Sequence, residues 1–573
     1  MNQKKIDILN ALYLKKDNFY YLIQKLGESD KNVQELINDG YINQNFTLNL
    51  DKCQKYKVKK AIILAAGYGL RMLPINDTIP KALISIKGER LIERLIEQLH
   101  AVGVYEIYIV VGYMKEKLEY LQKKYDVKLI VNRFFFSDNN CLSALLACKY
   151  MDNAYLLPCD LYFAENPFNY FEYQSWYMLS NKKDVKGYFS ITNDKQLVKG
   201  KKWFYDAVGL AFIDQYDSKI LHNRFQKMIG WCKKCYWEEA IVDHKDLHIK
   251  ARFINYDSYN EINTFNDLLN IDCESKSLLN NDIKMILDTF DVDIKQLRNI
   301  RIMRKGMTNR SFVFTINNKE YLMRIPGSGS EQLIDRKKEY DVYRKINMYN
   351  ICDPVIYMNQ KNGIKITEFL DDARNCDSLS DNDLKKCMIM LKYFHDKNIG
   401  VDFKFDLFSK ILEYEQLRQD KSIFSDYEEV KEDVFSLKSF IEENVSNYTL
   451  CHIDPVADNF LMLKDGSVKL IDWEYAAMQD PHLDIAMFAL YSFFDKNQTD
   501  KLIDMYFNEK VSENIRYKIY AYIAVAGLLW SNWCEFKIRL GNEYYEYANK
   551  QYQMAREYLS LVKKFLNKKE KAE

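Results

Sequence analysis

The pattern of hydrophobic and polar positions changes character twice along the 573-residue chain. Up to residue 57, apolar residues recur at helical spacing in three short stretches, and Phe46, Leu48 and Leu50 then alternate with polar residues as in a strand. Helix, helix, glycine turn, helix and strand is the order found in small winged helix-turn-helix modules. We therefore expect such a module over residues 1–57.

From residue 58 onward, short apolar runs such as 61–65 and 107–111 alternate with longer helical stretches such as 91–100. This alternation predicts a doubly wound α/β domain with parallel strands, which we place at residues 58–272. Beyond it, two strand-like runs flank an Asn-Asn turn at 317–318, and mostly helical sequence follows. The pattern predicts a second domain of α+β type, over residues 280–573.

Charge and hydropathy argue against several classes of function. The 82 basic and 81 acidic side chains nearly cancel, which argues against a main role in neutralising nucleic acid or an anionic membrane. Residues 28–39 carry four acids and one lysine, so we expect the first module to serve packing or regulation rather than DNA binding. With no signal-peptide pattern at its start and no apolar run of about 18 residues, the chain is expected to be cytoplasmic, without a membrane span.

A glycine-rich motif follows the first apolar run of the α/β domain. Residues 64–71 read Leu-Ala-Ala-Gly-Tyr-Gly-Leu-Arg, and a Pro-Lys pair follows at 80–81. The bare backbone of such a turn can approach a triphosphate, and Arg71 and Lys81 can neutralise the charge that develops as pyrophosphate leaves. We expect Arg71 and Lys81 to be catalytic and the nucleotide-binding set to comprise Ala65, Ala66, Gly67, Gly69, Arg71 and Lys81.

These motifs resemble the nucleotidyltransferase superfamily that makes nucleoside-diphosphate sugars and alcohols, and in detail the bacterial CTP:phosphocholine cytidylyltransferases. The resemblance implies a Mg²⁺ site at Asp160 and at Glu238, which stands where an Asp is expected; carboxylate oxygens suit this ion. Asn263 stands where relatives usually carry an acid. The resemblance also implies an aromatic box for a quaternary ammonium, with core packing as the alternative for each member: Trp203, Tyr236 and Trp237.

A second motif lies in the C-terminal part, where Cys-His-Ile-Asp at 451–454 is followed by Asn459 and by Asp472. This is the spacing of a kinase-like phosphotransferase. Asp454 can accept the proton of a substrate hydroxyl, whereas Asn459 and Asp472 can hold Mg²⁺ on the ATP phosphates. We therefore expect a protein-kinase-like, two-lobed fold in which Asp454 and Asn459 are catalytic.

The strand-rich start of this domain agrees with that interpretation. A Gly-Met-Thr-Asn stretch at 306–309 stands where a phosphate-covering loop belongs, and Arg324 on the next strand takes the place of the kinase lysine. Glu339, on the following helix, is its expected partner, although a solvated surface glutamate is the alternative. The predicted nucleotide contacts are Thr308, Asn309, Arg324 and Glu339.

The set as a whole resembles the choline and ethanolamine kinases over about residues 295–555. That resemblance implies that Trp530 and Trp533, which share one helix face at i and i+3, line a choline pocket. Trp473, beside the metal-binding candidate Asp472, joins the candidate substrate contacts. Core packing is the alternative interpretation of these tryptophans.

Together the two halves predict a bifunctional enzyme that makes CDP-choline. Its partners would be choline, phosphocholine, ATP and CTP, with Mg²⁺ as cofactor, and the oligomeric state stays open. Two other interpretations remain: an ethanolamine or sugar kinase fused to the matching nucleotidyltransferase, or a choline-responsive DNA-binding regulator. The intact acids Asp160, Asp454 and Asp472 favour an enzyme.

Overall fold

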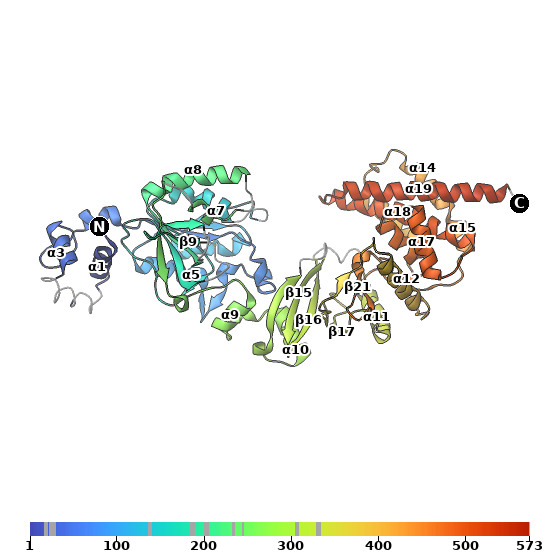
Figure 1. Ribbon diagram of the computed structural model, residues 1–573, viewed down its shortest axis with the longest axis horizontal. Coiled ribbons are helices and arrows are strands. Elements are labelled where there is room, and N and C mark those ends of the chain that lie inside the picture. Colours follow the sequence, from blue (N-terminus) through green and yellow to red (C-terminus); the bar gives the residue numbers. More distant parts are fainter. Residues whose placement is uncertain are drawn as a thin grey trace. The chain divides into compact units, whose positions relative to one another are not determined.

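The computed structural model divides into two compact units, Met1–Ile302 and Met303–Glu573 (Figure 1). The units are described separately below. The structure describes the following residues: 1–15, 21, 30–135, 140–183, 189–199, 205–231, 235–242, 246–303, 309–327 and 334–571.

The first unit is built on a sheet in the order β10-β9-β11-β6-β1-β4-β5, with β8 and β12 paired beside β11. The four neighbouring strands β6, β1, β4 and β5 run parallel. Residues 61–65 of β1 are all buried, as a central parallel strand with both faces covered requires. These four strands are β1 (Lys60–Ala65), β4 (Glu106–Val111), β5 (Lys128–Val131) and β6 (Ala154–Pro158).

Helices cover both faces of this sheet, which confirms the predicted doubly wound architecture (Figure 1). Residues of α5 and of the segment around α6 pack in one apolar core, and residues of α7 and α8 pack in the other. The remaining elements of this α/β part are β2 (Ser85–Ile86), β3 (Glu89–Arg90), α5 (Leu91–Ala101), α6 (Tyr120–Tyr125), α7 (Asn140–Ala147), β8 (Trp176–Lys183), β9 (Phe189–Ile191), β10 (Leu197–Lys199), β11 (Tyr205–Ile213), α8 (Gln215–Trp231) and β12 (Lys250–Ile254).

Two short strands outside the large sheet carry the edge of the first candidate site. β7 (Leu161–Phe163) begins directly after Asp160 and pairs antiparallel with β13 (Tyr259–Glu261). The backbone N–H of Ile262 also donates to the carbonyl of Asp160, at 2.9 Å. Residues near 160 and near 262 therefore lie side by side, although about a hundred residues separate them. The unit continues through α9 (Phe265–Ile271), α10 (Asn281–Phe290) and β14 (Arg298–Met303).

The N-terminal segment packs on the α/β part of the same unit. It contains α1 (Gln3–Tyr13), α3 (Lys31–Asn38) and α4 (Leu50–Cys53), and a single bridge joins Ile42 and Leu48. Among the described residues this arrangement does not show the predicted winged helix, because Leu50 begins a helix instead of ending a strand. The predicted second helix falls largely outside the described residues. Asn10 exchanges hydrogen bonds with the backbone of Phe171, at 3.0 and 2.8 Å, so the segment has a packing role.

The second unit has the predicted two-lobed, kinase-like organisation (Figure 1). An antiparallel sheet in the order β15-β16-β18-β17 and the helix α11 come first in the chain, and a helical lobe follows. The elements of the sheet lobe are β15 (Asn309–Ile316), β16 (Lys319–Pro326), α11 (Arg336–Ile346), β17 (Val355–Met358) and β18 (Lys365–Glu368).

Small strands of the helical lobe flank the predicted catalytic loop, which lies between β20 and β21 and is called the catalytic loop below. The helix α18 is buried along most of its length within the core of this lobe. None of the described helices is long and apolar enough to cross a membrane. The elements are β19 (Arg374–Asn375), α12 (Asp381–His395), α13 (Leu407–Arg418), α14 (Tyr427–Ser436), α15 (Lys438–Glu443), β20 (Thr449–Cys451), β21 (Phe460–Met462), β22 (Val468–Leu470), β23 (Ala477–Gln479), α16 (His482–Tyr491), α17 (Lys496–Phe507), α18 (Glu513–Arg539) and α19 (Tyr545–Glu570).

Candidate active sites

The glycine-rich loop leaves the buried end of β1. Ala65 and Ala66 are buried, and Gly69 has a φ of +66°, a conformation that glycine adopts without strain. A Cβ atom at Gly67 would meet nothing within 4 Å, whereas one at Gly69 would lie 3.6 Å from the Cβ of Lys81. The loop therefore has an open side at Gly67 and lies against Lys81.

The charged centre of the first site joins residues from three distant segments. The ammonium group of Lys81 donates to Asp160 and, at 2.9 Å, to Oδ1 of Asn263. The guanidinium group of Arg71 donates to the same Asn263 oxygen at 3.1 Å. The structure therefore brings together Arg71, Lys81 and Asp160, and it adds Asn263, which the sequence marked only as a departure from relatives.

This centre fits a divalent cation. The Oδ1 atom of Asp160 is buried and has no hydrogen-bond partner among the described residues. Burial raises the pKa of Glu238 to about 7, and the nearby charges of Glu261 and Asp160 act in the same direction. Glu261 keeps an exposed surface, yet loss of solvation followed by the charge of Asp160 raises its pKa as well. Carboxylates that repel one another in this way are stabilised by a hard cation.

Glu261 was missed at the level of sequence. The signal was the Glu-x-Asn spacing at 261–263, because residues two apart on an extended chain point to the same side. That spacing places Glu261 and Asn263 toward the same centre once β13 is paired with β7.

The predicted aromatic box of the first site stays a prediction, and its members lie in different surroundings. Trp203 lies outside the described residues, and Tyr236 is about half exposed, at 54%. Trp237 is completely buried and packs on Tyr177, with ring centroids 5.6 Å apart. This burial favours the alternative interpretation, core packing, and a contact of Trp237 with substrate stays a prediction. Its backbone N–H donates to Asn140 at 2.9 Å.

In the second unit, the catalytic loop is held by its backbone. Asp484 on α16 accepts hydrogen bonds from the N–H groups of His452 and Ile453, each at 2.8 Å. The imidazole of His452 donates to the carbonyl of Ile471 at 2.9 Å, and Asn459 donates to the carbonyl of Asp454 at 2.9 Å. These bonds bring Asp454 and Asn459 together.

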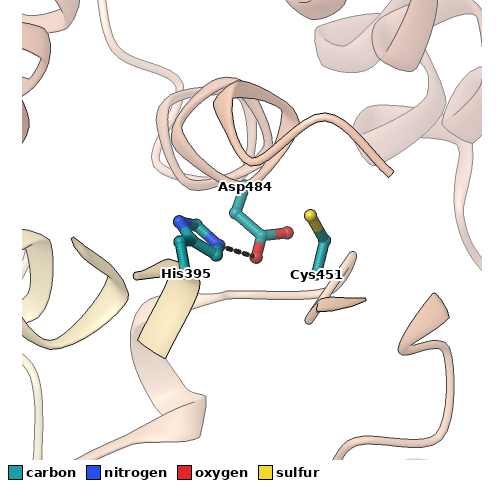
Figure 2. Close-up of side chains that lie close together, drawn as sticks. All are labelled: His395, Cys451 and Asp484. Atoms are coloured by element: carbon teal, nitrogen blue, oxygen red, sulfur yellow. Dashed lines mark hydrogen bonds and ion pairs between the residues drawn. The ribbon is translucent and has the colours of Figure 1, made fainter. Parts of the chain in front are cut away.

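A buried group of His395, Cys451 and Asp484 lies beneath this loop (Figure 2). His395 donates to Asp484 at 2.9 Å and accepts from the Tyr506 hydroxyl at 2.8 Å. Burial raises the pKa of the Cys451 thiol well above its usual value, so the sulfur keeps its proton and donates to a carbonyl. Both carboxylate oxygens of Asp484 already accept hydrogen bonds from His395 and from the loop backbone, and we therefore assign this group to anchoring of the loop.

Cations and acids also meet at the expected phosphate site of the second unit. Arg324 on β16 pairs with Glu339 on α11 and, at 2.6 Å, with Asp472, as the kinase pattern predicts. Arg336 lies 2.8 Å from Glu339 and 3.5 Å from Glu474, an acid that sequence reasoning did not include. Of the other predicted nucleotide contacts, Thr308 and the side chain of Asn309 lie outside the described residues.

The surroundings of Asp454 raise the pKa of its carboxyl group. Loss of solvation raises its pKa to about 8, and the charges of Asp472 and Glu474 act in the same direction, while Tyr491 and Asn459 oppose the shift. A carboxyl group whose pKa lies near the working pH is an effective general base. Its position next to the candidate metal residues is the one a phosphotransferase requires.

An aromatic cluster adjoins this base. The rings of Trp530 and Trp533 meet edge to face at 5.9 Å, and Trp530 also contacts Tyr475 at 5.9 Å and Tyr491 at 5.8 Å. Tyr491 interacts in turn with Asp454. The cluster of Tyr475, Tyr491, Trp530 and Trp533 is called the aromatic cluster below.

Trp473 does not join the aromatic cluster. It is completely buried, donates from its indole to the carbonyl of Leu470 at 2.7 Å, and packs edge-on against His452 with centroids 4.7 Å apart. These contacts favour the alternative interpretation, core packing beside the loop, and a contact of Trp473 with substrate stays a prediction.

The two centres, each joining cations to carboxylates at a phosphate-binding fold, define a nucleotide-dependent transferase with two catalytic domains. Residues 61–168 match the family model of MobA-like NTP transferase domains, and residues 300–556 match that of choline/ethanolamine kinases.

Three known proteins illustrate these similarities. The choline-phosphate cytidylyltransferase of Streptococcus pneumoniae is 31% identical over 216 residues, covering 36% of this chain and 94% of the relative. A 2-aminoethylphosphonate cytidylyltransferase of Lancefieldella rimae is 29% identical over 197 residues, covering 32% and 79%. The crystal structure of the choline kinase LicA from Streptococcus pneumoniae is 28% identical, covers 49% of this chain and 99% of that chain, and has a TM-score of 0.43. In its N-terminal part the chain belongs to the family of the choline-phosphate cytidylyltransferases, and its C-terminal part is similar to the choline/ethanolamine kinases.

Proposed function

We propose that this protein makes CDP-choline in two steps. The C-terminal domain transfers the γ-phosphoryl group of ATP to choline, and the N-terminal domain transfers the cytidylyl group of CTP to phosphocholine with release of pyrophosphate. The observation that carries the proposal is the aromatic cluster beside Asp454, because it sets a cation-binding surface next to a proton acceptor.

In the kinase step, Asp454 accepts the hydroxyl proton of choline while the oxygen attacks the γ-phosphorus of ATP. Arg324 exchanges its bond with Asp472 for a bond with phosphate oxygens and remains paired with Glu339. Asn459 and Asp472 are of the right type to hold Mg²⁺, which would neutralise phosphate charge there. Glu474 lies near enough to Arg324 and Arg336 to take part in this network.

In the cytidylyl step, a phosphate oxygen of phosphocholine attacks the α-phosphorus of CTP. That oxygen is ionised near neutral pH, so no general base is required. Arg71 and Lys81 stabilise the departing pyrophosphate. Asp160 would hold Mg²⁺ together with oxygens drawn from Glu238, Glu261 and Asn263, which converge on the same centre.

The aromatic cluster favours choline over ethanolamine. A trimethylammonium group has no N–H bonds to satisfy and binds to ring faces, whereas a primary ammonium group needs three acceptors. The indoles of Trp530 and Trp533 offer only N–H donors. A substrate panel tests this step: we expect phosphorylation of choline at a higher kcat/KM than that of ethanolamine, and use of CTP rather than UTP. Equal use of both alcohols would contradict the assignment.

The cellular location of the enzyme and the boundaries of its domains are also proposals. Both nucleotides are cytoplasmic metabolites, so we propose that the enzyme works in the cytoplasm. The proposed limits are 1–57 for the N-terminal module, 58–272 for the cytidylyltransferase and 280–573 for the kinase.

A further inference from the structure

The glycine-rich loop of the first unit is held through three of its carbonyl oxygens. The N–H of Tyr113 donates to the carbonyl of Ala66 at 3.1 Å. The side-chain nitrogen of Asn76 donates to two more, those of Tyr68 at 2.5 Å and Gly69 at 2.8 Å. Asn76 is completely buried, and the hydroxyl of Tyr113 donates to its backbone carbonyl at 3.1 Å. The loop is therefore fixed from one side by Asn76 and Tyr113.

The geometry of the peptide bond determines where the backbone N–H groups of the loop point. In a trans peptide the C=O of one residue and the N–H of the next point opposite ways. The carbonyls of residues 66, 68 and 69 point toward Asn76 and Tyr113. The N–H groups that follow them, those of residues 67, 69 and 70, therefore point away from Asn76 and Tyr113. The loop also has open space beside it, because a Cβ at Gly67 would meet nothing within 4 Å. A row of such N–H groups binds phosphate oxygens.

Asn76 also adjoins the charged centre. A Cβ at Gly69 would lie 3.4 Å from the side-chain nitrogen of Asn76 and 3.6 Å from Lys81. An asparagine carries two N–H donors on one atom and can serve two successive carbonyls. An aspartate of the same shape would present an oxygen to both carbonyls and would repel them.

We propose that Asn76 is a positioning residue for the CTP triphosphate: it turns the backbone donors of the loop toward the phosphates without touching the nucleotide. The proposal rests on the function proposed above for this domain. It predicts that Asn76 governs the use of CTP and leaves the binding of phosphocholine unchanged.

The test measures steady-state cytidylyl transfer by the full chain carrying Asn76→Asp or Asn76→Ala. A misdirected loop is expected to lower kcat/KM for CTP by about 10²-fold, with a raised KM for CTP. The KM for phosphocholine at saturating CTP stays at the wild-type value, and so does choline phosphorylation by the same preparation. Equilibrium binding of CTP in the absence of phosphocholine should weaken in parallel.

Asn10→Ala is the matched control, because Asn10 is also a buried asparagine whose side chain forms hydrogen bonds with backbone groups in the same unit. It should lower the melting temperature and leave the KM for CTP unchanged. A KM for CTP within about threefold of wild type in the Asn76 variants, or an equal change in the control, overturns the proposal. If both Asn76 variants fail to fold, Asn76→Thr retains one donor and must show an intermediate KM. Wild-type protein that transfers no cytidylyl group would instead refute the proposed function.

Discussion

Lys81 donates a hydrogen bond to Asp160, and both side chains are largely shielded from solvent. The cation assigned to the leaving pyrophosphate is thus paired with the acid assigned to the metal. In the absence of substrate, the charges of Lys81 and Asp160 neutralise one another, so neither is an isolated buried charge. The ion pair also holds both side chains in place until substrate provides new partners.

Replacing Lys81 with Ala should block the second step and leave the first intact. Loss of one preorganised cation at the developing charge lowers cytidylyl transfer by about 10²–10³-fold. Phosphocholine made from choline and ATP then accumulates, which ³¹P NMR of the reaction mixture detects. Lys60→Ala is the control, because Lys60 forms a similar ion pair with Asp152 at the start of β1. Undiminished CDP-choline from the Lys81 variant would contradict the assigned role.

Asp454→Asn should give the opposite pattern. Without the proton acceptor, formation of phosphocholine falls by about 10²–10⁴-fold, because an amide cannot take the hydroxyl proton. Supplied phosphocholine is still converted to CDP-choline at the wild-type rate, since the first unit has its own catalytic residues. Nucleotide consumption assayed separately with choline and with phosphocholine checks both statements, and loss of both activities would count against two independent sites.

The same substitution should stabilise the ligand-free protein in a pH-dependent way. Burial raises the pKa of Asp454 from its ordinary value near 3.8 to about 8, so the folded state keeps a proton that the unfolded chain releases. Wild-type stability therefore falls as pH rises from about 4 to 8, and this loss is absent with Asn. Thermal unfolding without Mg²⁺ or nucleotide should show a gap between variant and wild type that widens up to pH 8. A gap independent of pH would refute the shift.

Tryptophan variants distinguish a role in substrate binding from a role in core packing. Trp530→Leu removes a ring face for the cation and should raise the KM for choline about tenfold, with the KM for ATP unchanged. Trp473→Phe loses the bond to Leu470 and some packing, so it should cost about 1–3 kcal/mol of stability with little change in the KM for choline. A raised KM for choline in the Trp473 variant, but not in the Trp530 variant, would instead place Trp473 in the substrate pocket.

The anchor beneath the catalytic loop can be distinguished from a metal site. Asp484→Asn replaces one of the two carboxylate oxygens that accept from backbone N–H groups with an NH₂ donor, and it should cost about 1–3 kcal/mol together with most kinase activity. Cys451→Ala should retain that activity, because the thiol only donates to neighbouring carbonyls. Equal damage from both variants, with a melting temperature lowered by a chelator in Mg²⁺-free buffer, would indicate a bound metal instead.

Local patterns in the sequence predicted some of the contacts that the structure contains. The loop after β1 and the Arg324–Glu339 pair follow from motifs whose residues lie close in sequence or on adjoining elements. The role of Asn263 did not follow, because its contacts with Lys81 and Arg71 join residues 182 and 192 positions apart. The pairing of β7 with β13 brings the segment of Asn263 beside that of Asp160, which Lys81 also contacts.

The tryptophans show a second limit of sequence reasoning. A tryptophan next to a catalytic acid can face the pocket or the core, and composition does not distinguish these directions. Trp530 and Trp533 share a face through helical spacing, whereas Trp237 begins a single short 3₁₀ turn and Trp473 lies outside the helices and strands, so no such period applies to either. The docking of α1 on Phe171 likewise depends on tertiary contacts alone.

The most direct test of the whole account follows choline through both reactions in one vessel. Purified protein is mixed with choline, ATP, CTP and Mg²⁺, and phosphorus-containing products are quantified by ³¹P NMR over time. We predict transient phosphocholine, followed by CDP-choline and pyrophosphate in equal amounts, with one ADP for each CDP-choline. Formation of phosphocholine that is never converted, or conversion that proceeds with UTP as well as with CTP, would contradict the proposed function.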